Sequence, residues 1–332
     1  MKAQIIDQFG PPSVFYAADI AKPTLIAGHV LIKVHATSVN PVDCKIRSGA
    51  VAAIAPDFPA VLHGDVAGVV EAVADDVGNF KVGDAVYGCA GGLKGTGGAL
   101  AEYMLADAKS LALKPATLSM SEAAALPLVS ITAWDALFVK NQLTEKDTIL
   151  IHGGVGGVGH IAVQLAKWRG AKVFVTVRKP EDFDQVNSYG VDGVINATTE
   201  EVDSYVNRVT GGRGFDVVFD TVGGPNLDKS LVAAAINGCV VTTAARSTHD
   251  LSPMHAKSLT LSVVFMLIPI LKNQGRAEHG AILKQIAQIV DAGKLKPLID
   301  SHSFTLESVA KAHALLESGA AHGKIVIKVA AD

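Results

Sequence analysis

The stretch "ILIHGGVGGVGHIAV" (149–163) decides the fold of one part of the chain. It opens on apolar residues typical of a buried strand and then carries the spacing Gly154-x-Gly156-x-x-Gly159. From Val158 onward, apolar residues recur at the spacing of a helix. Gly170 follows them, and a glycine at this point is typical of the C-terminal cap of a helix. This order predicts a dinucleotide-binding unit, because the glycines admit a pyrophosphate and the helix N-terminus offers it N–H groups. The alternative is an ordinary glycine-rich turn, since a chain with 32 glycines produces chance matches.

The same rhythm continues on both sides of this stretch. Apolar runs alternate with helix-prone segments such as "TEEVDSYVNRVTGG" (199–212). The runs that we interpret as buried strands are "DTILI" (147–151), "AKVFVTV" (171–177), "VDGVIN" (191–196), "FDVVFDTV" (215–222) and "GCVVTT" (238–243). Near-continuous apolar strands that alternate with helices predict a doubly wound parallel sheet.

The rest of the chain has a different texture. Residues 1 to about 120 contain short β-rich runs such as "HVLIKVHATSV" (29–39), which predict a barrel or a sandwich. Residues 119–138 are helix-prone, with Ser121 as the expected N-cap. Helices are expected over 279–295 and 306–319, and the closing "HGKIVIKV" (322–329) is expected to return as a strand to the first domain. The prediction is an α/β protein with one domain over 1–123 and 270–332 and a dinucleotide-binding domain over 124–269.

Composition excludes several classes of protein. The 332 residues are 49% apolar, and their net charge of −3 and aromatic content of 5% argue against a nucleic-acid surface. Cys44, Cys89 and Cys239 lie far apart, which excludes a disulfide framework and a cysteine metal knuckle. The longest apolar run, 259–271, is too short to span a bilayer. We therefore expect a soluble cytoplasmic protein.

The end of the second predicted strand indicates which cofactor is used. An acidic residue there would bind the ribose of NAD, but "VTVRKP" (175–180) places Arg178 and Lys179 at that point. Arg178 can offer a planar fork to the 2′-phosphate of NADP, Lys179 adds charge, and Thr176 can add a hydroxyl. The alternative is a solvated pair of cations. His152, just before the glycine turn, is expected to be a packing residue.

Several ordered segments carry a family resemblance. They are "SVNPVDCKIRSG" (38–49), "VLHGDVAGVVEAVADDVGNFKVGDAVYG" (61–88), "GGALAEYMLADAKSLALKPATLSMSEAAALPLVSITAWDALF" (97–138), the glycine turn and "HGKIVIKV". The chain resembles the medium-chain dehydrogenase/reductase superfamily, most closely its quinone oxidoreductase (zeta-crystallin-like) branch. The resemblance implies a GroES-like β-barrel domain, a Rossmann domain and an active site in the cleft between them.

The resemblance also raises the question of zinc, which alcohol dehydrogenases of the superfamily use. Their first catalytic ligand, a cysteine, falls at Asn40, and their histidine falls at Gly64, between His63 and Asp65. Their third ligand falls near Val129–Ser130, and the four cysteines of a structural zinc lobe have no counterpart. We therefore expect no metal. Without a Lewis acid, hydride donation to an electrophilic quinone or enone is expected rather than alcohol oxidation.

The site residues follow from the same resemblance. It implies that Asn40 lies near the nicotinamide and that Asp43 orders the same loop, and these two are the predicted catalytic residues. The resemblance also implies cofactor contacts at the ends of other strands and at one helix: Ser130, Thr132, Val222, Gly223, Thr243 and Ala244. They join the predicted cofactor residues of the glycine turn and of the second strand: Gly154, Gly156, Gly157, Val158, Gly159, Thr176, Arg178 and Lys179. Asp220 is expected to be structural. Substrate contacts are left open at Lys45, where some relatives carry an aromatic residue.

The segment 258–267 matches the region where family members pair edge strands, so a homodimer is expected. A buried central strand is the alternative.

The leading hypothesis is an NADPH-dependent, zinc-independent reductase of a small-molecule quinone or enone. The alternatives are an enoyl-thioester reductase on the same scaffold and a non-catalytic NADPH-binding or RNA-associated protein.

Overall fold

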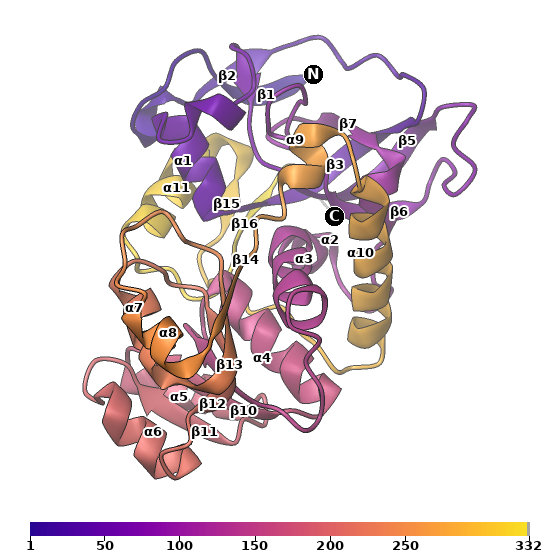
Figure 1. Ribbon diagram of the computed structural model, residues 1–332. Coiled ribbons are helices and arrows are strands. Elements are labelled where there is room, and N and C mark those ends of the chain that lie inside the picture. The colour runs from indigo at the N-terminus through magenta and orange to yellow at the C-terminus, as the bar shows by residue number, and fades with distance from the viewer. Residues whose placement is uncertain (331–332) are drawn as a thin grey trace. The chain divides into compact units, whose positions relative to one another are not determined.

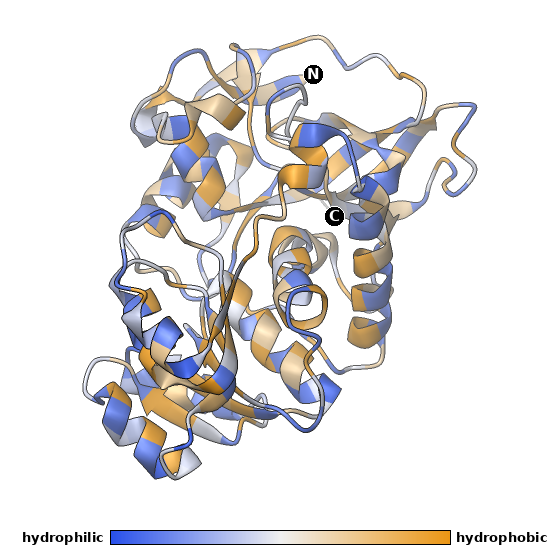
Figure 2. Cartoon of the chain, in the orientation of Figure 1, coloured by the Kyte–Doolittle hydropathy of each residue, from blue (hydrophilic) through white to orange (hydrophobic). Residues whose placement is uncertain are grey.

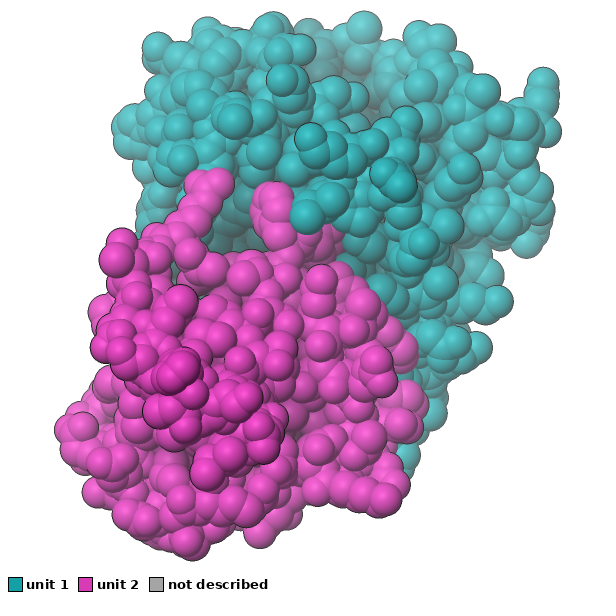
Figure 3. Space-filling view, viewed as in Figure 1, with its two compact units in different colours: residues 1–131, 267–332 teal, residues 132–266 magenta. Residues whose placement is uncertain are grey.

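The computed structural model describes residues 1–330 and divides the chain into two compact units. Unit 1 comprises residues 1–131 and 267–332, and unit 2 comprises residues 132–266 (Figure 3). Helix α3 (Pro127–Trp134) crosses from one unit to the other in sequence, and a π-helical turn, Asp135–Val139, follows it.

Unit 2 is built on a parallel sheet of six strands. The spatial order of its strands is β11-β10-β9-β12-β13-β14. Strands β10 and β11 are therefore added on one side of β9, and β12, β13 and β14 on the other side. The strands are β9 (Thr148–His152), β10 (Lys172–Val177), β11 (Gly193–Asn196), β12 (Phe215–Asp220), β13 (Ala234–Thr242) and β14 (Thr260–Val263). Every strand expected from an apolar run is present, and β14 lies at the edge of the sheet.

Helices cover this sheet. They are α4 (Gly157–Arg169), α5 (Phe183–Asn187), α6 (Val202–Thr210), α7 (Pro225–Ala233) and α8 (Ser252–Lys257). Helix α4 packs on β9 and β10, whereas α6, α7 and α8 form a group on β12 and β13; Figure 1 shows strands between α4 and that group. Helix α4 ends at Gly170, whose φ of 92° is the left-handed conformation that favours glycine. The predicted C-cap is therefore confirmed.

Unit 1 contains two sheets, of three strands (β2-β1-β4) and seven strands (β15-β16-β3-β5-β6-β8, with β7 on β3). Its strands are β1 (Lys2–Ile6), β2 (Tyr16–Asp19), β3 (His29–Val39), β4 (Ala60–Val61), β5 (Asp65–Val73), β6 (Ala85–Cys89), β7 (Tyr103–Asp107), β8 (Leu111–Leu113), β15 (Phe304–Thr305) and β16 (Ile325–Lys328). Its helices are α1 (Pro41–Ser48), α2 (Met120–Ala124), α9 (Ile268–Lys272), α10 (Arg276–Asp291) and α11 (Val309–Glu317). The closing strand β16 pairs antiparallel with β3, so the predicted return of the C-terminal segment is confirmed.

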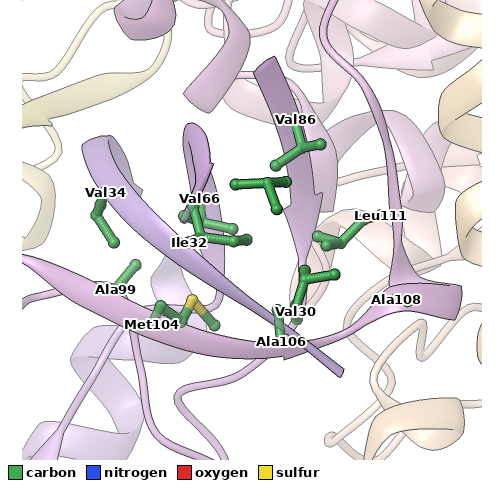
Figure 4. Packing of buried hydrophobic residues seen from close by; sticks show 12 residues of the cluster. Val30, Ile32, Val34, Val66, Val86, Ala99, Met104, Ala106, Ala108 and Leu111 are labelled. Atoms are coloured by element: carbon green, nitrogen blue, oxygen red, sulfur yellow. The ribbon is translucent and has the colours of Figure 1, made fainter. Parts of the chain in front are cut away.

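The core of unit 1 lies on the inner faces of its long strands. Val30, Ile32 and Val34 alternate along β3 and pack with Val66 and Val86 of the neighbouring strands (Figure 4). Figure 2 shows hydrophilic and apolar bands along α10, whose buried residues recur at helical spacing. This packing fixes β3, at whose end the polar site of unit 1 begins.

One helix start differs from the sequence-based expectation. The N-cap of α2 is Ser119 rather than Ser121, because Glu122 N donates to Ser119 Oγ while Ser119 N donates to Glu122 Oε2. This reciprocal arrangement satisfies two amides at once, so it is favoured over a cap two residues later. The expectation for Ser121 was wrong.

Across residues 1–330, the helices are all too short or too polar to cross a membrane.

Candidate functional site

The glycine turn of unit 2 is folded tightly against its own sheet. Gly153 N and Gly154 N donate to Thr176 O at 3.1 and 3.0 Å. A Cβ on Gly159 would lie 2.0 Å from Gly153 O, and a Cβ on Gly154 would lie 2.3 Å from a methyl of Val175. Positions 154 and 159 therefore require glycine, because the neighbouring atoms of the turn and of β10 leave no room for a side chain.

Helix α4 begins directly after this turn, with Gly156 as its N-cap. The amides of Gly157, Val158 and Gly159 belong to the first helical turn, which has no carbonyl partner one turn earlier. His160 N makes the first bond of the helix, to Gly156 O at 3.1 Å. The predicted phosphate-binding groups thus lie together at the N-terminus of a 13-residue helix.

Thr176 and His152 brace the turn from beneath. The Thr176 hydroxyl accepts from Gly153 N at 3.2 Å and lies 3.1 Å from His152 Nδ1. Both side chains are buried, and burial lowers the pKa of His152 to about 4, so the ring is neutral at pH 7. The recorded bonds of Thr176 therefore serve the turn, and its predicted bond to the cofactor stays a prediction.

Arg178 and Lys179 follow β10 and are both exposed. Lys179 Nζ lies 3.9 Å from Glu181 Oε1, whereas the side chain of Arg178 has no recorded partner within residues 1–330. The one hydrogen of Thr198 Oγ1 is directed to Asn196 Oδ1 at 2.6 Å, and Arg178 O lies 3.3 Å from the same hydroxyl. The guanidinium of Arg178 is therefore free to bind an anion.

The remaining predicted cofactor residues of unit 2 meet at the ends of β12 and β13. Val222 N and Gly223 N donate to Asp220 Oδ1 at 2.8 and 3.0 Å, so Asp220 has the structural bonds expected of it. A Cβ on Gly223 would lie 2.4 Å from Ala244 Cβ, which places the two segments in contact. Thr243 N donates to Asp220 O at 3.2 Å. All four positions thus share the carboxyl end of the sheet, where nucleotides bind in such folds.

Ser130 and Thr132 fall on either side of the division between the units. Both are buried. The Ser130 hydroxyl has no hydrogen-bond partner within residues 1–330, and its predicted contact with the cofactor stays a prediction.

Unit 1 holds a buried polar cluster centred on Asn40, the residue just before α1. Asn40 Nδ2 donates to Asp65 Oδ2 at 2.8 Å, and Lys324 Nζ donates to Asn40 Oδ1 at 2.5 Å. Lys324 Nζ also donates to Val39 O at 3.1 Å and lies 3.5 Å from Asp65 Oδ2. Asp65 accepts in addition from Ser38 Oγ at 2.7 Å. We name Asn40, Asp65 and Lys324 the amide clamp.

Asp43 orders the entry of the chain into α1. Its Oδ2 accepts from Asn40 N at 2.7 Å, which is the bond expected of an acidic residue in the first turn of a helix. Burial raises the pKa of Asp43 to about 7 despite this bond, and Asp65 adds to the rise. The structure thus places Asp43 beside Asn40, and its role in the reaction stays a prediction.

A second chain of hydrogen bonds leads away from Asp65. Thr37 Oγ1 donates to Asp65 O at 2.6 Å and lies 3.3 Å from His63 Nδ1. His63 Nε2 lies 2.8 Å from His313 Nε2, and His313 Nδ1 lies 3.3 Å from Cys44 Sγ. Because Thr37 has one proton, the series has one consistent order, in which Cys44 donates to His313, His313 to His63 and His63 to Thr37.

The pKa shifts along this series of hydrogen bonds, the histidine chain, keep Cys44, His63 and His313 uncharged. Burial lowers the pKa of His313 to about 3 and also lowers the pKa of His63. Burial raises the pKa of the Cys44 thiol to about 12. All three groups are therefore uncharged at pH 7, which the proton order requires.

The amide clamp does not fit a catalytic zinc ion. Asn40, Gly64 and Val129 stand where the resemblance places ligands, and none of them offers a histidine, cysteine or carboxylate ligand. Asp65 already lies beside the ammonium of Lys324, and His63 is bonded within its own chain. Within residues 1–330 no cluster of three or more histidine, cysteine or acidic side chains could hold a metal ion.

Sequence reasoning did not place Lys324 beside Asn40, although it singled out Asn40. The two residues are 284 positions apart, and a lysine before a terminal strand carries no signal of its own. The link appears only once β16 pairs with β3, because the register that joins Ile325 to Val39 carries Lys324 to Asn40.

Comparisons with known proteins show which family the chain resembles in sequence. A family model described as "Alcohol dehydrogenase GroES-like domain" matches residues 26–116, and one described as "Zinc-binding dehydrogenase" matches residues 189–327. The quinone oxidoreductase of Homo sapiens is 32% identical over 98% of this chain and 97% of its own. The chloroplastic NADPH-dependent alkenal/one oxidoreductase of Arabidopsis thaliana is 33% identical over 98% of this chain and 79% of its own.

A solved structure covers the whole fold. The crystal structure of an alcohol dehydrogenase superfamily protein from Novosphingobium aromaticivorans matches with a TM-score of 0.95 and 40% identity, over 99% of this chain and 100% of that one. The fold and these matches show that the chain belongs to the medium-chain dehydrogenase/reductase superfamily. Within the superfamily its likeness to quinone oxidoreductases covers nearly the full length, which makes it an oxidoreductase of that branch.

Proposed function

We propose that this chain is an NADPH-dependent oxidoreductase that transfers hydride to a quinone or another conjugated carbonyl acceptor without zinc. The observation that carries the proposal is the exposed Arg178, which follows the phosphate turn and β10 and has no recorded side-chain partner within residues 1–330. A guanidinium at this place fits the 2′-phosphate that distinguishes NADPH from NADH. The Arabidopsis relative, whose name specifies NADPH, supports the same cofactor.

The residues of unit 2 have separate tasks in this proposal. Bound NADPH supplies the hydride, and the protein holds and orients it. The amides of Gly157, Val158 and Gly159 and the positive end of α4 would hold the pyrophosphate. Arg178, with Lys179 beside it, would hold the 2′-phosphate.

The choice of acceptor follows from the amide clamp. A simple ketone needs a Lewis acid or a strong proton donor to accept hydride, and the donor set around Asn40 does not suit zinc. A quinone or an enone is already electrophilic, so it needs alignment and a hydrogen-bond donor for the oxygen that becomes negative. The names of the human and Arabidopsis relatives, a quinone oxidoreductase and an alkenal/one oxidoreductase, support this class of acceptor.

The proposal includes a cytoplasmic homodimer that pairs through segment 258–267. Strand β14 ends its sheet, and Val263 and Phe265 of this segment are exposed. An apolar sheet edge of this kind is stabilised when a second copy covers it. Sedimentation velocity at micromolar concentration tests the dimer, and a monomer there would contradict it.

A small panel of acceptors tests the function. Purified protein is mixed with NADPH and benzoquinone, phenanthrenequinone, an alkenal, crotonyl-CoA or a simple alcohol with NADP⁺, and the nicotinamide absorbance is followed. Rapid loss of absorbance with the quinones or the alkenal supports the proposal. Preference for crotonyl-CoA would instead indicate an enoyl-thioester reductase, and tight NADPH binding without turnover would indicate a binding protein.

A further inference from the structure

We propose that Lys324 is a positioning residue for the reaction, because its buried ammonium fixes and polarises the amide of Asn40 so that this amide donates a hydrogen bond to the oxygen of the acceptor. The inference deepens the proposed function and rests on it. Its basis is the geometry of the amide clamp.

The position of Lys324 is fixed by backbone bonds on both sides. Lys324 N donates to Leu298 O at 2.8 Å, and Asp300 N donates to Lys324 O at 2.9 Å. The side chain is 3% exposed, and all three groups near its ammonium lie around Asn40: Val39 O, Asn40 Oδ1 and Asp65 Oδ2. Three ammonium hydrogens therefore have three local acceptors, and none points to solvent.

The ammonium decides which way the Asn40 amide faces. An ammonium can only donate, so the atom at 2.5 Å must be the amide oxygen, and Nδ2 must face Asp65. Asp65 is itself held by Ser38 Oγ at 2.7 Å and Leu128 N at 2.8 Å. A reversed amide would set its NH₂ group against the ammonium, so the clamp excludes it.

One hydrogen of the amide remains to bind a ligand. An amide nitrogen carries two hydrogens, and within residues 1–330 the recorded partner of Asn40 Nδ2 is Asp65 Oδ2 alone. The cation on Oδ1 draws electron density from the amide, which makes the second N–H a stronger donor. A fixed donor of this kind in a buried setting stabilises negative charge that appears during a reaction.

The reaction of a conjugated acceptor places such charge on its oxygen. One hydride, with two electrons, would form a C–H bond at the β-carbon. The π electrons of the C=C bond then form a double bond between the α-carbon and the carbonyl carbon, and the π electrons of the C=O bond move to the oxygen, which becomes an enolate. Loss of the hydride converts NADPH to NADP⁺, and a proton from water adds at the α-carbon to complete the saturated product. The N–H of Asn40 would bind the oxygen more tightly as an enolate than as a ketone, so its effect appears in kcat.

The closing experiment compares Lys324→Met with Lys328→Met, a matched change at an exposed lysine of β16. With an alkenal as acceptor, Lys324→Met should lower kcat about ten- to a hundredfold. Its Kd for NADPH, read from fluorescence quenching, should change less than about twofold, and Lys328→Met should change neither. In a double-mutant cycle, Lys324→Met/Asn40→Ala should be no slower than Asn40→Ala alone, because Lys324 acts through Asn40.

A purely structural lysine predicts other results. Lys324→Met would then lower the melting temperature and leave kcat of the folded fraction unchanged, or its effect on kcat would add to that of Asn40→Ala. Either result overturns the inference. Wild-type protein that reduces no acceptor of the panel refutes the proposed function itself, so the two failures are distinguishable.

Two further measurements protect the test against misfolding. Lys324→Met/Asp65→Asn removes both buried charges and keeps a side chain of similar size, and it should fold with the same low kcat. Binding of nitrophenol to the NADP⁺ complex needs no turnover. Wild type should lower the pKa of the bound phenol, as its absorbance reports, and Lys324→Met should lose this shift; an equal shift in both overturns the inference.

Discussion

Arg178→Ala should convert this protein from an enzyme selective for NADPH into one that scarcely distinguishes NADPH from NADH. The side chain follows β10, is exposed and has no recorded acidic partner within residues 1–330, so no internal ion pair competes for it. A charge-assisted hydrogen bond contributes about 1.5–3 kcal/mol, and about 1.4 kcal/mol corresponds to a factor of ten in affinity. The Kd for NADPH should therefore rise about ten- to a hundredfold, and the Kd for NADH should stay nearly constant.

The assay is titration of each dinucleotide by fluorescence quenching, at low and at high salt. The loss of NADPH affinity should shrink as salt rises, because an exposed charge pair is screened. Arg213→Ala is the matched control, since Arg213 is paired with Asp216 at the opposite end of the sheet strands. Lys179→Ala should have a smaller effect than Arg178→Ala, because Glu181 lies 3.9 Å from its ammonium. Equal use of NADPH and NADH by the wild type, or an equal loss of both in Arg178→Ala, would refute the reasoning.

Three further predictions concern the turn, the histidine chain and the sheet edge. Gly159→Ala should abolish dinucleotide binding, because its Cβ would lie 2.0 Å from Gly153 O, whereas Gly78→Ala, with open space around the Cβ, should be silent in the same titration. His313→Gln should reduce, by the share of one histidine, the loss of stability between pH 7 and pH 5 that urea unfolding measures, because buried His63 and His152 still contribute. In the wild type, His313 has a pKa near 6.5 when unfolded, and burial lowers its pKa to about 3 in the folded protein. As the pH falls through this window, the unfolded state binds the proton first, so the free energy of unfolding decreases by up to about 1.4 kcal/mol per pH unit. An unchanged slope in His313→Gln would contradict a neutral, buried His313. Val263→Lys should give a monomer in sedimentation velocity, since it places charge on the exposed edge strand, and an intact dimer would show that the edge is not the interface.

Much of the fold was predictable because its signals are local. The apolar run of β3 matches His29–Val39, and the end of α4 at Gly170 follows from a residue that tolerates positive φ. The N-cap at Ser119 could also have been found, since Ser119 and Glu122 have the spacing of a capping box. The π-helical turn at Asp135–Val139 has no comparable local signal.

The site was predictable only in part, because it joins residues that are distant in sequence. The glycine turn and Arg178 lie in adjacent βα segments, so sequence reasoning placed both at one end of the sheet. Asn40 entered through its family motif, but its partner Lys324 depends on the pairing of β16 with β3. The histidine chain likewise joins His63 to His313, 250 positions apart, and no spacing rule connects them.

The most direct test of the central claim is the fate of the hydride itself. NADPH carrying deuterium at the transferred position is incubated with wild-type protein and an alkenal, and the product is analysed by mass spectrometry and NMR. The account predicts one deuterium at the β-carbon of a saturated aldehyde, with one NADP⁺ formed per product. Deuterium at the carbonyl carbon, or NADPH that binds and is not consumed with any acceptor of the panel, would contradict it.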